Sequence, residues 1–359
     1  MTGVAERAAS ARASRAARRS RVPYPLVLGL LGALVLATAT AGIATGSVRI
    51  PPDQVWGILL HRLHPALSPA DWTPARATIV LDVRLPRVVL CGVVGAGLSV
   101  CGMALQAIVR NPLADPMLLG VSSGASVGAV LVVVFHVSWF GMFSLPLAAF
   151  GGALLALVLV YALARSGSRM TTVRLVLAGV ATAEVLSAVA SYLVITSDDP
   201  HGAESALRWM LGGLGGTTWT VLWIPAAAVL TGTAILLGLS RPLNLLLAGE
   251  EAATALGLDV HRFRAALFVL VALMIGTIVA VSGAIGFVGL IMPHAVRLLV
   301  GADHRRALPV VALLGASFLI VADVAARTLI SPEEIPVGIL TALVGGPFFL
   351  YLMRRRAAG

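Results

Sequence analysis

Long apolar runs without any charged residue constrain the fold of this chain more than any other feature of its sequence. Residues 25–48, 117–164 and 265–296 contain no Asp, Glu, Lys or Arg. A helix needs about 20 apolar residues to cross the hydrocarbon core of a bilayer. The first run therefore fits one crossing, and each of the other two is long enough for two. Only 12% of the residues are charged, about half the share in soluble domains, so we predict an all-α integral membrane protein.

The apolar runs and the turns between them predict about ten transmembrane helices. We place breaks at residues 137–145 and 282–286, inside the two longest runs. The predicted spans are residues 25–48, 88–109, 117–136, 146–164, 175–196, 220–239, 265–281, 287–300, 307–329 and 337–353. Most arginines then fall on one side, which the positive-inside rule makes the cytoplasm. We therefore expect a multi-pass protein of the cytoplasmic (inner) membrane with both termini in the cytoplasm.

Residues 1–22 differ from the rest of the chain in composition. They are rich in arginine, alanine and serine, and we expect a disordered basic tail on the cytoplasmic face. A cleaved secretion signal is the alternative, because an arginine pair precedes an apolar run. The uncharged stretch from Pro25 to Val48 is longer than a signal core, which favours a retained span. We expect residues 23–356 to form a single transmembrane domain.

One charged, helix-prone segment, residues 240–264, interrupts the apolar runs of the second half. Glu250 and Glu251 begin a short helical pattern that Gly257 ends, which places acids at the helix N-terminus and glycine at its C-cap. Asp259 is the expected N-cap of a second short helix. Two short helices on the water side of a membrane predict a docking element for another protein, with an ordinary cytoplasmic loop as the alternative.

Residue types that many enzymes need are missing or scattered. The chain contains no lysine, so it has no GxxxxGK[ST] phosphate-binding loop, and we assign any ATP hydrolysis of that kind to a partner. The seven histidines show no metal-binding spacing, and Cys91 and Cys101 lie too far apart along one helix to form a disulfide. Nucleic-acid binding is disfavoured because the arginines flank apolar runs. We expect no catalytic residue, metal site or cofactor in this chain.

Glu184 is the acidic residue within the span predicted at residues 175–196. An ionisable side chain that faces lipid is costly, so we expect Glu184 to face protein or a water-filled cavity. Two interpretations stay open at this point. The carboxyl group could take part in a proton or cation relay, or it could be a hydrogen-bonded structural acid.

Glycines recur at short spacings in the second and third predicted spans. They are Gly92, Gly95 and Gly102, followed by Gly120, Gly124 and Gly128. Small residues at such spacing let helix backbones approach closely, which favours helix association in lipid. We favour packing within one subunit over a dimer seam.

Several motifs resemble a single family of membrane proteins, in the same order along the chain. They are RLPR at residues 84–87, LQAIVRNPLADPMLLGVSSGAS at 105–126, RWMLGGLGG at 208–216, GEEAATALG at 249–257, GAIGFVGLIMPHAVRLLVGADHR at 283–305, ADVAART at 322–328 and EIPVGILTALVGGPFF at 334–349. The chain resembles the FecCD-type permeases of binding-protein-dependent ABC importers, which carry iron-siderophore complexes, haem or vitamin B12. The resemblance covers most of the chain beyond its basic tail.

This resemblance implies a type II ABC importer architecture built on a homodimer, with substrate passing between the two copies. Two ATP-binding subunits would dock in the cytoplasm, and an extracytoplasmic substrate-binding (lipo)protein would dock on the other face. Coupling helices at about residues 241–262 would contact the ATPase through Leu247, Gly249, Glu250, Glu251, Ala253, Leu256 and Gly257. Arg84, Arg87 and Arg327 would meet acidic residues of the binding protein, although arginines at membrane edges also serve topology.

Within this family we expect an iron(III)-siderophore complex as cargo, with cobalamin and then haem as alternatives. The segment RWMLGGLGG also resembles the corresponding part of vitamin B12 permeases. A proton-coupled secondary transporter that uses Glu184 is the alternative from another class. An intramembrane enzyme is disfavoured because the sequence contains no recognisable catalytic constellation.

Overall fold

The computed structural model describes residues 23–65, 71–166, 169–170 and 172–357. The predicted basic tail, residues 1–22, lies outside the described part of the chain. The described residues are helical apart from turns and a short β-hairpin. In the hairpin, β1 (Arg165–Ser166) pairs with β2 (Arg169–Met170). The prediction of an all-α membrane protein is therefore confirmed.

Within the described residues, seven helical segments are long and apolar enough to cross a membrane, and three shorter apolar helices accompany them. The long segments are α2 (Tyr24–Ala44), α4 to α5 (Pro74–Val109), η4 to α7 (Gly141–Ala164), α8 (Thr172–Ile195), α10 (Trp219–Gly238), α13 (Val260–Ser282) and α15 (His304–Thr328). The shorter apolar helices are α6 (Val121–Val134), α14 (Val288–Val300) and the part Val337–Tyr351 of α16 (Val337–Ala357). Each corresponds to one of the ten predicted spans.

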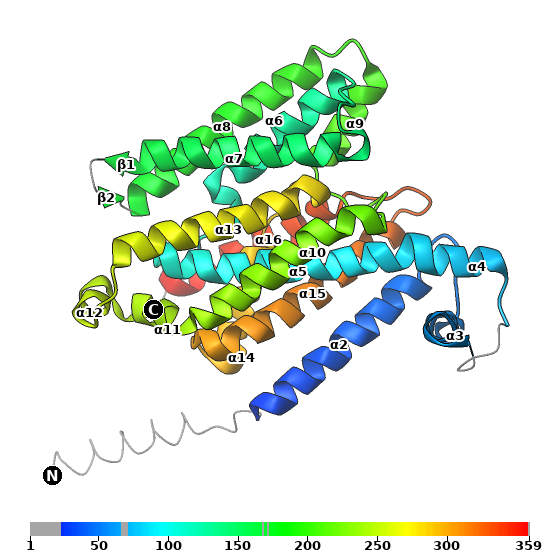
Figure 1. Cartoon of the computed structure of the whole chain (residues 1–359), viewed down its shortest axis with the longest axis horizontal. Helices are drawn as coiled ribbons and strands as arrows, with labels where there is room; N and C mark the ends of the chain where they lie inside the picture. The colour runs from blue at the N-terminus through cyan, green and yellow to red at the C-terminus, as the bar shows by residue number, and fades with distance from the viewer. Residues whose placement is uncertain (1–22, 66–70, 167–168, 171, 358–359) are drawn as a thin grey trace.

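α5 (Leu85–Val109) lies at the centre of the bundle, where it packs against α10, α13, α14 and α15 (Figure 1). Glycines allow these helices and the α6–α7 pair to approach so closely that an added Cβ would overlap the neighbouring backbone. The close pairs are Gly95 with Gly315, Gly102 with Gly289, Gly124 with Gly152 and Gly128 with Ala148. Four of the six glycines predicted to serve packing within one subunit, Gly95, Gly102, Gly124 and Gly128, make these close contacts.

The bundle has two layers and two distinct ends (Figure 1). α6, α7, α8 and α9 (Pro200–Met210) form one layer, which meets the other through α13. The β-hairpin lies at one end with α11 (Ser240–Ala248) and α12 (Glu250–Ala255), and we name this the α12 end. The short helices α3 (Pro52–Leu63) and α4 (Pro74–Thr78) lie at the opposite end with α9, which we name the α9 end.

The second span begins earlier than the sequence predicted. We predicted a span that begins at Val88, but a continuous helical segment already starts at Pro74. Proline is well tolerated in a first helical turn. Pro86 does not end the helix. The preceding turn η2 (Ile79–Arg84) is π-helical, and this wider turn tolerates a residue that has no backbone N–H to donate.

The charged segment at residues 240–264 also differs from the prediction. Its two short helices are α11 and α12, whereas the helix that follows Asp259 is the full-length span α13. Pro242 lies in the first turn of α11, where a proline does not stop a helix. The Asp259 side chain does cap α13, as predicted, by accepting a hydrogen bond from the Arg262 backbone N–H.

Candidate functional site

α11 and α12 form a small helical element that the chain presents at the α12 end (Figure 1). Gly249 joins the two helices with a φ of 119°, and Gly257 follows α12 with a φ of 85°. Residues with a side chain are strained at such angles, so both turns favour glycine. Gly257 is exposed and Gly249 partly so, which leaves both backbones accessible to a partner.

Most of the predicted coupling side chains lie on the open surface of this element. Leu247 is 46% and Leu256 is 68% exposed, and Glu250 and Glu251 are exposed as well. Exposed leucines beside acidic residues are suited to a protein partner. Ala253 is different because it is fully buried, so it holds α12 against the bundle rather than reaching outward.

Polar contacts fasten the α11–α12 element to two spans. The Asn244 side chain donates to Asp303 Oδ1 at 2.7 Å, and its Oδ1 accepts from the His304 backbone N–H at 3.0 Å. The hydrogen bond from Asn244 lowers the pKa of Asp303, which caps α15. Arg264 of α13 forms an ion pair with Glu250 at 3.1 Å. These contacts join the α11–α12 element to residues near the N-terminal ends of α13 and α15.

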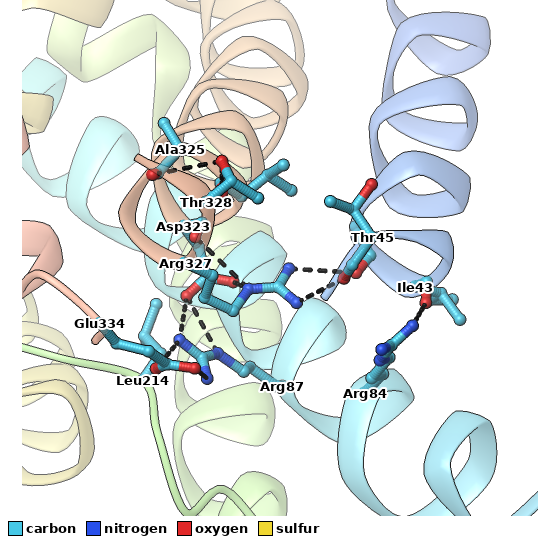
Figure 2. Close-up of polar contacts among 12 residues, drawn as sticks. Ile43, Thr45, Arg84, Arg87, Leu214, Asp323, Ala325, Arg327, Thr328 and Glu334 are labelled. Atoms are coloured by element: carbon cyan, nitrogen blue, oxygen red, sulfur yellow. Dashed lines mark hydrogen bonds and ion pairs between the residues drawn. The ribbon is translucent and has the colours of Figure 1, made fainter. Parts of the chain in front are cut away.

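The three arginines predicted for docking lie together at the α9 end (Figure 2). Arg84 and Arg327 both hold the C-terminal end of α2, where backbone carbonyls lack helical N–H partners. Arg84 donates to the carbonyl oxygens of Ile43, Ala44 and Val48, and Arg327 donates to those of Gly42 and Thr45. These two side chains therefore have a structural task.

Asp323 of α15 links two of these arginines. It is fully buried, its Oδ1 accepts hydrogen bonds from Arg87 Nε and Nη2 at 3.0 and 2.8 Å, and its Oδ2 lies 3.0 Å from Arg327 Nε. Arg87 also donates to both carboxylate oxygens of Glu334, at 3.2 and 2.9 Å. A buried charge needs such pairing to be tolerated. We refer to Arg84, Arg87, Asp323, Arg327 and Glu334 as the arginine cluster (Figure 2).

The arginine cluster is turned further inward than the docking hypothesis suggested. The side chains of Arg87 and Arg327 are 13% and 6% exposed, and Arg84 is buried. The sequence analysis missed both acidic members. The four-residue spacing of Asp323 and Arg327 was an available signal, because charges at i and i+4 meet on one helix face. Three arginines against two carboxylates leave the cluster with an excess positive charge.

Comparison of the whole sequence with known proteins identifies its family. Residues 31–355 match the FecCD transport family. The chain belongs to the FecCD transport family. It is 48% identical over 279 residues to the cobalamin import system permease protein of Halobacterium salinarum, covering 77% of this chain and 74% of the relative. It is 40% identical over 339 residues to the hemin transport system permease protein of Yersinia pestis, covering 94% and 97%.

A solved structure supports the same assignment for the FecCD chain. An inward-facing metal-chelate type ABC transporter shares 34% identity with it, with a TM-score of 0.79 over 92% of this chain and 99% of the other. The matched region extends from α2 to α16, and therefore includes both ends of the bundle. The FecCD chain is the membrane-embedded permease subunit of an ABC importer, a transport protein. The resemblance found in the sequence is thus confirmed at the level of family and fold.

Proposed function

We propose that this FecCD permease acts as a homodimer that moves a corrinoid of the cobalamin class into the cytoplasm. The observation that carries the proposal is the 48% identity with a cobalamin import permease over most of both chains. The segment RWMLGGLGG at residues 208–216 resembles vitamin B12 permeases and supports the same cargo. The relatives give less support to the iron(III)-siderophore complex, which the sequence analysis placed first.

Haem is the second candidate for the cargo. The hemin permease of Yersinia pestis matches 94% of this chain, more than the cobalamin permease does, although at lower identity. Cargo recognition in such importers is shared with a binding protein. Overall sequence identity is therefore stronger evidence for the type of transporter than for its cargo. A direct comparison of cargoes is therefore the required test.

We assign ATP hydrolysis to two separate cytoplasmic subunits that bind the α11–α12 element. The exposed Leu247, Glu250 and Leu256 support this assignment, as does the absence of lysine from the sequence. In this proposal the permease holds no cofactor or metal of its own, and ATP is bound only by the partner. Movement of the ATPase would reach α15 through Asn244 and α13 through Glu250.

We assign docking of an extracytoplasmic substrate-binding (lipo)protein to the α9 end, at and around the arginine cluster. The excess positive charge of the cluster suits an acidic docking face and would orient the approaching protein. Because the ATPase lies in the cytoplasm, the α12 end would face the cytoplasm. Tyr24, which begins α2, is hydrogen-bonded to the Arg306 carbonyl at the α12 end, which agrees with a cytoplasmic N-terminal tail.

Uptake of labelled cargo into proteoliposomes tests this proposal. The vesicles contain the permease with its neighbouring ATPase and are supplied with the neighbouring binding protein. Cobalamin, haem and a ferric siderophore are compared at equal concentration. We expect only cobalamin to accumulate, and only with both ATP and the binding protein. Accumulation of haem or the ferric siderophore instead would overturn the cargo assignment while leaving the importer assignment intact.

A further inference from the structure

A polar cavity lies at the α12 end, where four helices meet (Figure 1). The last turns of α5 and α14 form part of its wall, and α11 and the first turn of α15 complete it. Its volume is about 260 Å³, slightly below the usual range for sites of small organic ligands. The cavity therefore suits a compact chemical group rather than a molecule as large as a nucleotide or a cargo.

Two arginines line this cavity, which we name the basic pocket. Arg110 is the residue that ends α5, and Arg297 lies in the last turn of α14. None of the described residues that line the pocket is Asp or Glu. Like charges that share a cavity repel one another unless an anion lies between them. The pocket therefore favours an anionic occupant.

A buried glutamine positions one of the two arginines. Gln106 Oε1 accepts a hydrogen bond from Arg297 Nη2 at 2.7 Å. Gln106 Nε2 donates to the carbonyl oxygens of Ala114 and Gly289, each at 3.3 Å, which keeps the amide oxygen directed toward the guanidinium group. A side chain that is already held in place loses little conformational freedom when a ligand binds. Arg297 is therefore preorganised at the wall of the pocket.

Helix dipoles account for only part of the positive charge. A cation near a helix C-terminus offsets the dipole, and both arginines occupy such positions. Each helix C-terminus carries an effective charge of about −0.5, so two of them balance roughly one of the two arginines. An excess of about one positive charge is left in the basic pocket. A capping role alone does not neutralise it.

The other walls of the basic pocket belong to the attachment between α11 and α15. His304 lines the pocket at the start of α15, and its Nδ1 lies 2.7 Å from Asn244 Oδ1 of α11. Leu247 of α11 lines the pocket as well. An anion bound by Arg110 and Arg297 would therefore join α5 to α14 beside the point where α11 is fastened to α15.

We propose that the basic pocket binds a phosphate group, which holds α11 against α5, α14 and α15. The planar fork of an arginine matches two oxygens of a phosphate, and a second arginine adds to the charge complementarity. Inorganic phosphate and the headgroup of an anionic phospholipid share this chemistry. The cytoplasmic location of the pocket rests on the proposed function, whereas binding of the phosphate group does not.

Protection of a cysteine from chemical labelling tests whether the pocket binds phosphate. Ala302 lines the pocket and is exposed, so Ala302→Cys places a reactive thiol at the site. The two native cysteines are buried and give little background. The full-length variant in phospholipid-free detergent is treated with an uncharged maleimide at fixed pH and ionic strength. One arm adds inorganic phosphate in place of chloride, and the other adds phosphatidylglycerol in place of diacylglycerol.

We expect a saturating ligand in at least one arm to slow labelling roughly fivefold or more, because an occupied site excludes the reagent. Protection by inorganic phosphate assigns the site to the free ion, and protection by the lipid alone assigns it to a headgroup. Both results support the proposal. Labelling that is unchanged in both arms would overturn it.

A second substitution in the Ala302→Cys chain tests the residues of the pocket. Arg110 is exposed, so Arg110→Gln should leave the fold intact and abolish most of the protection. Arg305→Gln is the matched control, since it removes the same charge from an exposed arginine that does not line the pocket. Equal protection in the two variants would contradict the assignment, because it would show only a general attraction of anions to this end of the chain.

Hydrogen exchange tests whether the occupant holds α11. Exchange of backbone amides reports local opening, so the amides of α11 should exchange more slowly when phosphate or the lipid is bound. The amides of α9, at the opposite end, serve as the control and should not change. The slowing should disappear in Arg110→Gln. Exchange of α11 that is unaffected by a ligand that protects the introduced cysteine would refute the proposed attachment.

Discussion

At the scale of single residues, the arginine cluster depends on one carboxylate. Asp323 is fully buried and balances Arg87 and Arg327 at the same time. Removing one partner from a buried ion pair leaves the other charge uncompensated, which is strongly destabilising. Glu334 also binds Arg87 but is half exposed, so solvent screens its contribution. The two acids of the cluster therefore have different roles.

Asp323→Asn keeps the size of the side chain and removes its charge. We expect this change to lower the free energy of unfolding in detergent by roughly 3–5 kcal/mol, because Arg87 and Arg327 lose their shared partner. Glu334→Gln is the matched control and should cost less than about 1 kcal/mol. Equal losses in the two variants, measured by denaturant unfolding, would contradict the central position of Asp323.

Glu334 also affects the proposed docking surface. Its carboxylate forms an ion pair with Arg87 there, which makes the guanidinium group less available to the binding protein. Glu334→Gln should free this guanidinium group and tighten binding of the binding protein roughly two- to fivefold at low salt. The gain should shrink as salt is added. Glu333→Gln removes the same charge from the neighbouring position, which is not a partner of Arg87. Identical affinities for the two variants would argue against Arg87 as a docking residue.

The sequence identified the arginines of the cluster but not how they are held. Their motifs are local, whereas the pairing of Arg87 with Asp323 joins residues 236 positions apart. That contact depends on the close approach of α5 and α15, which no local pattern encodes. The capping of α2 carbonyls by Arg84 and Arg327 was unpredictable for the same reason.

At the scale of secondary-structure elements, the α11–α12 element works through its attachments. Asn244→Ala removes the hydrogen bonds to Asp303 and His304 and should leave ATP hydrolysis intact while reducing cargo uptake per ATP roughly five- to tenfold. Thr254→Ala is the control, since the Thr254 side chain donates only to the Glu250 carbonyl within α12 in the described contacts. Uptake per ATP that matches wild type in both variants would show that Asn244 does not transmit the movement.

Helix packing gives a second prediction at this scale. A Cβ at Gly95 would overlap the Gly315 carbonyl oxygen, whereas one at Gly92 would make ordinary contacts with Ile320 and Ala316. Gly95→Ala should therefore destabilise the protein by about 1–3 kcal/mol through separation of α5 from α15. Gly92→Ala should be neutral or stabilising by up to about 1 kcal/mol, because alanine favours helix. A comparison of thermal unfolding in detergent checks the difference.

The positions of the spans were largely predictable, because the length of a charge-free run sets how many times the chain can cross a bilayer. The breaks in the two longest runs were located correctly for this reason. The early start at Pro74 was missed, because a π-helical turn lets the helix continue through Pro86. The burial of Ala253 could not be predicted either, because alanine in a polar segment occurs at both buried and exposed positions.

At the scale of the whole molecule, α15 connects the two proposed partner surfaces. Its N-terminus is bound to Asn244 of the α11–α12 element, and Asp323 and Arg327 lie near its other end. A helix of 25 residues is roughly 37 Å long, enough to extend through the membrane. A movement imposed at the α12 end can thus reach the arginine cluster through one continuous element. This connection suits a permease that links ATP hydrolysis on one face to binding-protein docking on the other.

The most direct test of the central claim is the energy source of uptake. Proteoliposomes with the permease and ATPase, supplied with binding protein and labelled cobalamin, are measured with ATP, without ATP, and after collapse of the proton gradient. We predict accumulation that requires ATP and the binding protein and persists when the proton gradient is collapsed. Accumulation driven by a proton gradient without ATP would contradict the account and would make Glu184 the site of energy coupling.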